Sequence, residues 1–199
     1  TGLTIEDLVI GGGNTSSAQV IEANNLNDLI LEDLDIKNFD EPSRLIRTSS
    51  VGSAQLRRLD VERNATEETP VQLDASYIEV GDTRMALNTA NNAGGLNPVN
   101  GGAMRLTWGG SGSGFAQLYR SDFESHEADD GGAIWTSVET DITACSFRSN
   151  EALDRGGAID ASGSALRFEN AYISKNQADV GGAIWADADL VIAYSTVID

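Results

Sequence analysis

Residues 150–186 read NEALDRGGAIDASGSALRFENAYISKNQADVGGAIWA and contain the tetrapeptide Gly-Gly-Ala-Ile twice, at Gly156 and at Gly181. The two copies begin 25 residues apart, and related motifs precede them at intervals of 25 and 30 residues. The glycine pairs therefore mark a repeat of about 25 residues. The two earlier copies are GGAIW at Gly131 and GGAMR at Gly101.

A second signature lies between the glycine pairs: an apolar residue, two variable residues and a polar residue. The polar residue is Asn150 in one copy and Asn176 in the next, whereas His126 has the same place in an earlier copy. We interpret His126 as a polar corner residue that replaces asparagine, because a lone histidine without a matching nucleophile gives little reason to propose a triad. The copies read FESH (123–126), FRSN (147–150) and ISKN (173–176).

The N-terminal half keeps the same spacing without these glycine motifs, so that seven or eight copies would fill the chain. A period in this range predicts a solenoid. The segments alternate between apolar and polar residues and show no sustained helical period, which argues against leucine-rich repeats and favours strands. The corresponding early segments are VIEAN (20–24), LIRTS (45–49) and VQLDA (71–75).

We predict an all-β fold, a right-handed parallel β-helix of seven to eight coils of roughly 25 residues, over residues 1–199 as a single domain. Equivalent strands would stack about 4.8 Å apart. The glycine pair would supply positive φ and a close approach of neighbouring coils, while the following isoleucine faces the core. The asparagines at 150 and 176 would stack at a second corner and bond to neighbouring turns.

Two segments interrupt the repeat. TWGGSGSGF at 107–115 is predicted to be a glycine-rich turn expansion, and residues 81–102 are predicted to be a loop insertion. Insertions in solenoids map to one face and often bind ligands. Asn91 and Asn92 could therefore bind a sugar or a peptide, or the segment could be a plain turn.

The composition excludes several classes of protein. The chain has 31 acidic and 13 basic residues and a formal net charge of -18, which argues against nucleic-acid binding. Hydrophobic residues make up 40 % of the chain, too many for a disordered acidic tail. No apolar run approaches the roughly 20 residues of a membrane span. Cys145 is the only cysteine, so an intrachain disulfide is excluded, and we expect it to be a small buried residue.

The GGA[I/L/V] and F-x-x-N signatures over 101–199 resemble the repeats of the polymorphic outer membrane protein family. The wider group is the right-handed parallel β-helix proteins of the pectin lyase-like superfamily. GGAMR and FESH depart from the family pattern, and residues 1–100 share only its spacing. The resemblance implies an extracellular or cell-surface location and a fragment of a longer exported protein. It implies adhesion, and it carries over no catalytic residue.

Alternation predicts one outward column of side chains that follows the glycine motif from coil to coil. One interpretation is a ladder of exposed charges that helps to set the register. The other is a carbohydrate-binding face, on which Trp135 and Trp185 stack against sugar rings. Asp74 between Arg47 and Arg105 faintly resembles a lyase site but is first a salt bridge. The predicted column is Glu22, Arg47, Asp74, Arg105, Trp135, Asp160 and Trp185.

A second column consists of Asp129, Asp154 and Asp179, each two residues before a glycine pair. Stacked carboxylates repel one another unless something neutralises them. They could accept hydrogen bonds from backbone N–H groups in the turn, or calcium could bridge them. A residue inserted around 151–155 leaves the register of this column open. We expect no cofactor, and calcium is the one alternative.

These observations predict a non-catalytic, secreted or surface-displayed repeat module with an adhesive or structural role. One alternative is a polysaccharide lyase or glycoside hydrolase of the same fold, and another is a purely structural stalk or filament subunit. The expected partner is a polysaccharide, or a surface protein of a host or neighbouring cell. Open coil ends could also allow end-to-end self-association.

Overall fold

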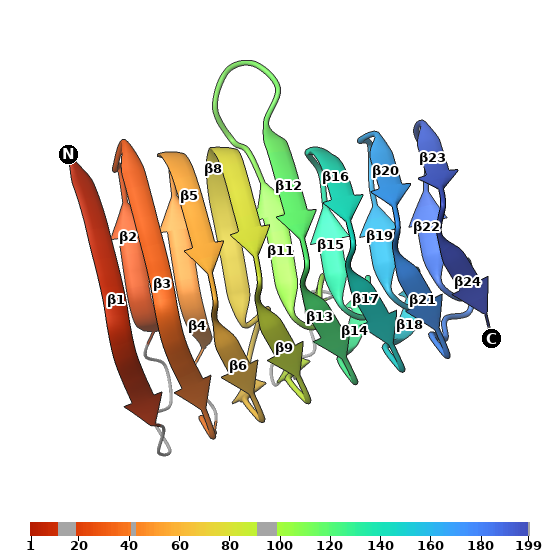
Figure 1. Ribbon diagram of the computed structural model, residues 1–199, viewed down its shortest axis with the longest axis horizontal. Coiled ribbons are helices and arrows are strands. Elements are labelled where there is room, and N and C mark those ends of the chain that lie inside the picture. Colours follow the sequence, from red (N-terminus) through yellow and green to blue (C-terminus); the bar gives the residue numbers. More distant parts are fainter. Residues whose placement is uncertain (12–18, 41–42, 91–98, 199) are drawn as a thin grey trace.

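The computed structural model describes residues 1–11, 19–40, 43–90 and 99–198, and every regular element in them is a β-strand. The chain winds into a parallel β-helix of about seven coils spaced by about 25 residues, which confirms the predicted fold class (Figure 1). The described residues contain no helix with the length and apolar character needed to cross a membrane.

The front sheet faces the viewer in Figure 1 and has two rows of parallel strands. The upper row consists of β1 (Gly2–Gly11), β3 (Asp28–Lys37), β5 (Val51–Arg57), the second half of β8 (Val71–Gly81), β12 (Phe115–Tyr119), β16 (Glu139–Thr143), β20 (Leu166–Glu169) and β23 (Leu190–Ala193). The lower row consists of β6 (Asp60–Glu62), β9 (Arg84–Ala86), β13 (Asp122–Glu124), β17 (Ser146–Arg148), β21 (Tyr172–Ser174) and β24 (Thr196–Ile198), while β1 and β3 run through both rows.

Two further sheets complete each coil behind the front sheet (Figure 1). The back sheet consists of β2 (Gln19–Asn24), β4 (Arg44–Ser49), the first half of β8, β11 (Met104–Thr107), β15 (Ile134–Thr136), β19 (Ile159–Ala161) and β22 (Ile184–Ala186). The short sheet consists of β7 (Ala65–Thr66), β10 (Thr89–Ala90), β14 (Glu127–Asp130) and β18 (Glu151–Arg155).

The core is a set of apolar columns that run along the axis. Ile134 and Ile159 pair in register and have no exposed surface, as the sequence predicts. In the lower front row the rings of Phe123 and Phe147 stack with centroids 5.0 Å apart, and Phe168 contacts Phe147 edge-on. Each fully buried side chain of this size contributes about 1.5–3 kcal/mol. The columns therefore supply the main force that holds successive coils together.

The two glycines of each motif have different roles. Gly131, Gly156 and Gly181 have φ between 62° and 63°, a region that residues with a Cβ atom rarely adopt. The second glycine lies against the next coil: a Cβ atom on Gly132 would lie 2.1 Å from the carbonyl oxygen of Gly157. The prediction of positive φ and close approach is confirmed.

A ladder of buried polar side chains runs along the corner between the lower front row and the short sheet. The Asn150 amide donates to Oδ1 of Asn176 at 2.9 Å and to the carbonyl oxygen of Phe123 at 3.2 Å. His126 takes the next position: its backbone N–H donates to Asn150 Oδ1 at 3.1 Å. Its ring lies 3.0 Å from the Met85 carbonyl oxygen. The interpretation of His126 as an asparagine substitute is confirmed.

Small polar groups occupy the bend between the two front rows. The hydroxyl of Ser121 accepts from the backbone N–H of Thr83 at 3.1 Å, and the thiol of Cys145 donates to the Thr143 carbonyl oxygen at 3.5 Å. Burial raises the pKa of the Cys145 thiol to about 12, so it stays protonated. This position suits the small buried residue that the sequence predicts.

The two interruptions differ from each other. Residues 108–114 form the turn between β11 and β12 that projects beyond the neighbouring coils (Figure 1). By contrast, β9 and β10 lie within 81–102, so residues up to Ala90 follow the regular coil and were wrongly assigned to an insertion. Residues 91–98 lie outside the described part of the chain.

The close approach of the coils can be tested by Gly132→Ala. The added methyl group would meet backbone atoms of the next coil, so we expect a loss on the order of 3 kcal/mol in the free energy of unfolding. Gly163→Ala is the control, because alanine is strained at the φ of 78° found there, whereas nothing lies within 4 Å of the added atom. It should cost about 1–2 kcal/mol. Equal losses in urea unfolding would contradict the close-approach argument.

His126 makes stability depend on pH. Burial lowers its pKa from 6.5 to about 4, so the folded state holds it neutral while the unfolded chain binds a proton. The contribution of neutral His126 to the free energy of unfolding is complete above pH 6.5 and is lost as the pH falls toward 4. At about 1.4 kcal/mol per pKa unit, the loss is roughly 3 kcal/mol. His126→Asn should flatten this part of the curve of unfolding free energy against pH. An unchanged curve in the variant would refute the assignment.

Candidate ligand-binding face

The outer face of the back sheet carries one in-register column of side chains, as the sequence predicts for six of its seven positions. The strand register pairs Arg105 with Trp135, Trp135 with Asp160, and Asp160 with Trp185. We call this column the outer strip. Its members in axial order are Glu22, Arg47, Gln72, Arg105, Trp135, Asp160 and Trp185.

Asp74 does not belong to the outer strip, and its predicted place between Arg47 and Arg105 is wrong. Gln72 occupies that place, because Val71 and not Leu73 pairs with the inward Ile46. Asp74 pairs with Thr107, and its Oδ1 accepts from the backbone N–H of Gly109 at 3.1 Å. Asp74 therefore holds the start of the 108–114 turn.

Asp160 is the centre of the aromatic end of the outer strip. It points away from the core and yet has no exposed surface. Ser162 donates its hydroxyl to Oδ1 at 2.6 Å, and Nη2 of Arg155 lies 3.3 Å from Oδ2 without hydrogen-bond geometry. Desolvation raises the pKa of Asp160, and it outweighs the lowering by Ser162 and Arg155.

Arg155 joins the short sheet to the outer strip. It is the last residue of β18, directly before Gly156, and its Nε donates to Asp130 Oδ1 at 3.1 Å. Its guanidinium carbon lies 4.3 Å from the ring centroid of Trp185. The bond to Asp130 raises the pKa of Arg155. One cation therefore neutralises two buried carboxylates and fixes an indole ring, a role the sequence analysis missed.

Both tryptophans are partly exposed, so each has surface that a ligand can reach. Arg105 holds Trp135 as Arg155 holds Trp185, since its guanidinium carbon lies 5.0 Å from the ring centroid. Strands two coils apart are separated by about 9.6 Å, which is twice the strand spacing. The outer strip thus presents two oriented indole rings on a rigid sheet, with the fully buried Asp160 between them.

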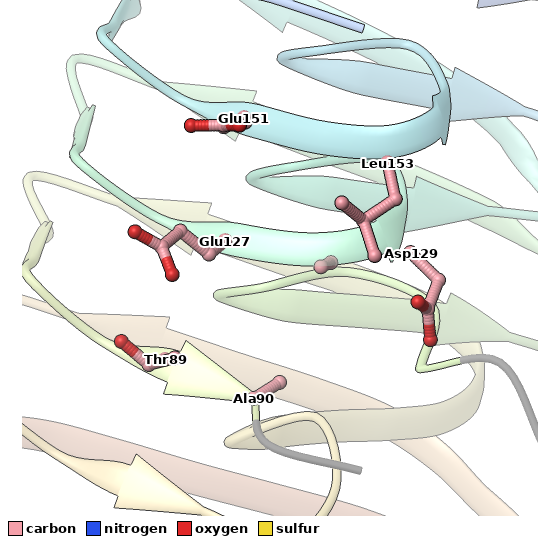
Figure 2. Close-up of a pocket in the computed structure, with 7 residues that line it drawn as sticks. Thr89, Ala90, Glu127, Asp129, Glu151 and Leu153 are labelled. Atoms are coloured by element: carbon pink, nitrogen blue, oxygen red, sulfur yellow. The ribbon is translucent and has the colours of Figure 1, made fainter. Parts of the chain in front are cut away.

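A separate hollow of about 350 Å³ lies on the short sheet (Figure 2). Glu127 and Glu151 occupy paired positions on adjacent coils, and Leu153 lies at the other end of the strands, near Asp129 (Figure 2). Asp129 lies at the far end, where its Oδ2 accepts from the backbone N–H of Val99 at 2.6 Å. Asp129 has the backbone-bonding role that we offered as the alternative to calcium.

The structure shows no site that gathers Asp129, Asp154 and Asp179. β18 carries the irregularity that the sequence indicated, because Ala128 pairs with Ala152 whereas Asp130 pairs with Arg155. Within the described residues there is no group of three or more His, Cys, Asp or Glu side chains that could hold a metal ion. Calcium binding remains a prediction. Asn91 and Asn92 lie outside the described residues.

Comparisons with known proteins add no relative. No family model matches the chain, and neither the curated proteins nor the solved structures contain a match.

Arg155 can be tested by Arg155→Gln, which leaves two buried carboxylates without their cation. We expect a loss of roughly 3 kcal/mol in the free energy of unfolding, the scale seen when one partner of a buried ion pair is removed. Arg167→Gln is the matched control, since Arg167 is exposed and 3.7 Å from Asp141. It should change stability by less than about 1 kcal/mol. Similar small losses in both variants would contradict the role of Arg155.

Proposed function

We propose that this chain is a non-catalytic binding module of an exported surface protein, and that its outer strip binds polysaccharide. The observation that carries the proposal is the pair of partly exposed indole rings on one sheet face, Trp135 and Trp185, each held by an arginine side chain. Aromatic faces bind sugars because the apolar side of a pyranose ring can lie flat on them. Rings that are fixed before binding lose little conformational entropy.

The surroundings of Asp160 favour binding over catalysis. A general acid or base must reach the proton that it transfers. Asp160 has the environment of a proton donor, because desolvation raises its pKa, but its carboxyl group has no exposed surface. Ser162 bonds to Oδ1 and the guanidinium of Arg155 lies beside the buried Oδ2, so the group supports the neighbouring rings instead of meeting a substrate.

The repeat sequence supports surface display. The glycine pair and the Asn150 ladder are the positions that resemble the repeats of the polymorphic outer membrane protein family, within the pectin lyase-like superfamily. Their structural roles explain why such motifs recur over residues 101–199, since these coils turn at the same corner. The resemblance also supports adhesion to a host or neighbouring cell, whose surface polysaccharides would be the ligands of the outer strip.

The proposal is tested by binding of the purified chain to a panel of neutral and acidic polysaccharides, with and without calcium, while product release is followed. We expect binding without release of reducing or unsaturated ends. Trp185→Ala should weaken binding at least tenfold. Tyr172→Ala is the control, because Tyr172 is an exposed aromatic residue on the front sheet.

Each other result would replace the proposal. Product release would show an enzyme of the same fold. Binding only to a surface protein would move the ligand class from saccharide to protein. The absence of any binding would leave a structural stalk as the better account. Tighter binding on adding calcium would show that a calcium site, such as the one predicted at Asp129, Asp154 and Asp179, takes part.

A further inference from the structure

Three arginines lie on neighbouring strands of the back sheet, in a chain that is otherwise strongly acidic. Arg47 and Arg105 lie on β4 and β11, on either side of Gln72, so all three side chains leave the same face on three consecutive coils. Arg44 lies on β4 three residues before Arg47. We call Arg44, Arg47 and Arg105 the arginine cluster. A net charge of -18 makes such a concentration of cations a local feature and not a general property of the surface.

Carboxylates do not balance the arginine cluster. Arg44 pairs with Glu68, and Arg47 reaches Glu22 only at 4.0 Å, with both side chains well exposed. No described carboxylate lies within salt-bridge distance of Arg105. An exposed pair such as Arg47 with Glu22 is worth at most about 1 kcal/mol, so a ligand can displace it.

Part of the hydrogen-bonding capacity of the arginine cluster is also unused. The Nε atoms of Arg44, Arg47 and Arg105 are all buried and have no hydrogen-bond partner. Desolvation, followed by the charges of Arg47 and Arg105, lowers the pKa of Arg44 to about 10. Desolvation also lowers the pKa of Arg105. Like charges of neighbouring arginines repel one another, and a bound anion would relieve that repulsion.

We infer that Arg47 and Arg105, with Gln72 between them and Arg44 on the same strand as Arg47, bind a carboxylate or sulfate group of an acidic saccharide. Guanidinium groups form paired hydrogen bonds with such oxyanions. The Gln72 amide supplies a further donor on the coil between the two arginines. This inference rests on the proposed function for its assignment to a saccharide, whereas the anion site itself rests on the arginine cluster.

The position of the cluster links it to the aromatic end. Arg105 contacts the Trp135 ring, so the anion site and the first indole ring lie on neighbouring coils. A chain that runs along the axis would place an acidic group over Gln72 and a sugar ring over Trp135. The outer strip would then select acidic saccharides and fix the direction in which they lie.

The anion site can be tested without a saccharide. We would measure the melting temperature of the wild-type chain in sodium sulfate and in sodium chloride at equal ionic strength, since a ligand that binds only the folded state raises it. Sulfate should stabilise the wild type, and Arg105→Gln and Arg47→Gln should lose the effect. Arg167→Gln, on the front sheet, should keep it. Each variant is compared with its own melting temperature in chloride, which separates folding from binding.

The saccharide assignment is tested with alginate and heparin against their carboxyl-reduced and desulfated forms. We expect the acidic forms to bind at least tenfold more tightly, with the difference lost in Arg105→Gln. Equal binding of charged and neutral forms would overturn the inference and leave the proposed function intact. A sulfate effect without polysaccharide binding would keep the anion site and overturn its assignment to a saccharide. No sulfate effect in the wild type would overturn the site.

Discussion

The in-register stacking of one coil on the next is the constraint on which every other feature depends. Parallel strands about 4.8 Å apart bring equivalent residues of each coil into columns, inward and outward alike. The close stacking needs a residue without a Cβ atom where Gly132 meets Gly157. This contact fixes the register of the strands that follow the corner. The same glycines therefore also align Trp135 with Asp160 on the outer face of the back sheet.

The stacking also explains how a buried polar corner is compatible with a stable core. Each asparagine of the ladder donates to a backbone carbonyl of the preceding coil and accepts from the backbone N–H of that coil's ladder residue, as Asn150 and Asn176 do. A histidine fits because its two ring nitrogens can take over these roles. It does so only while neutral, and its pKa of about 4 records the cost of charging it in that position.

The periodic part of the molecule could be predicted from the sequence, because a residue's place in the repeat decides whether it faces in or out. Trp135, Asp160 and Trp185 were found in this way. Asp74 was misplaced because VQLDA has no glycine pair to show which of its residues face the core. The structure pairs Val71 with Ile46, which puts Gln72 and not Asp74 beside Arg47. Arg155 was missed because it belongs to another sheet and reaches the outer strip across the glycine corner, which no period records.

The ladder gives the molecule an axial direction. The amide of Asn64 donates to Asn88 and the amide of Asn150 donates to Asn176, in both cases to the following coil. Their dipoles therefore point the same way, and hydrogen bonds in such a chain polarise and strengthen one another. The corner thus contains a row of aligned amide dipoles that is interrupted by one imidazole ring. One tautomer of that ring satisfies both neighbours: Nδ1 accepts from the backbone N–H of Asn88, and Nε2 donates to the carbonyl oxygen of Met85.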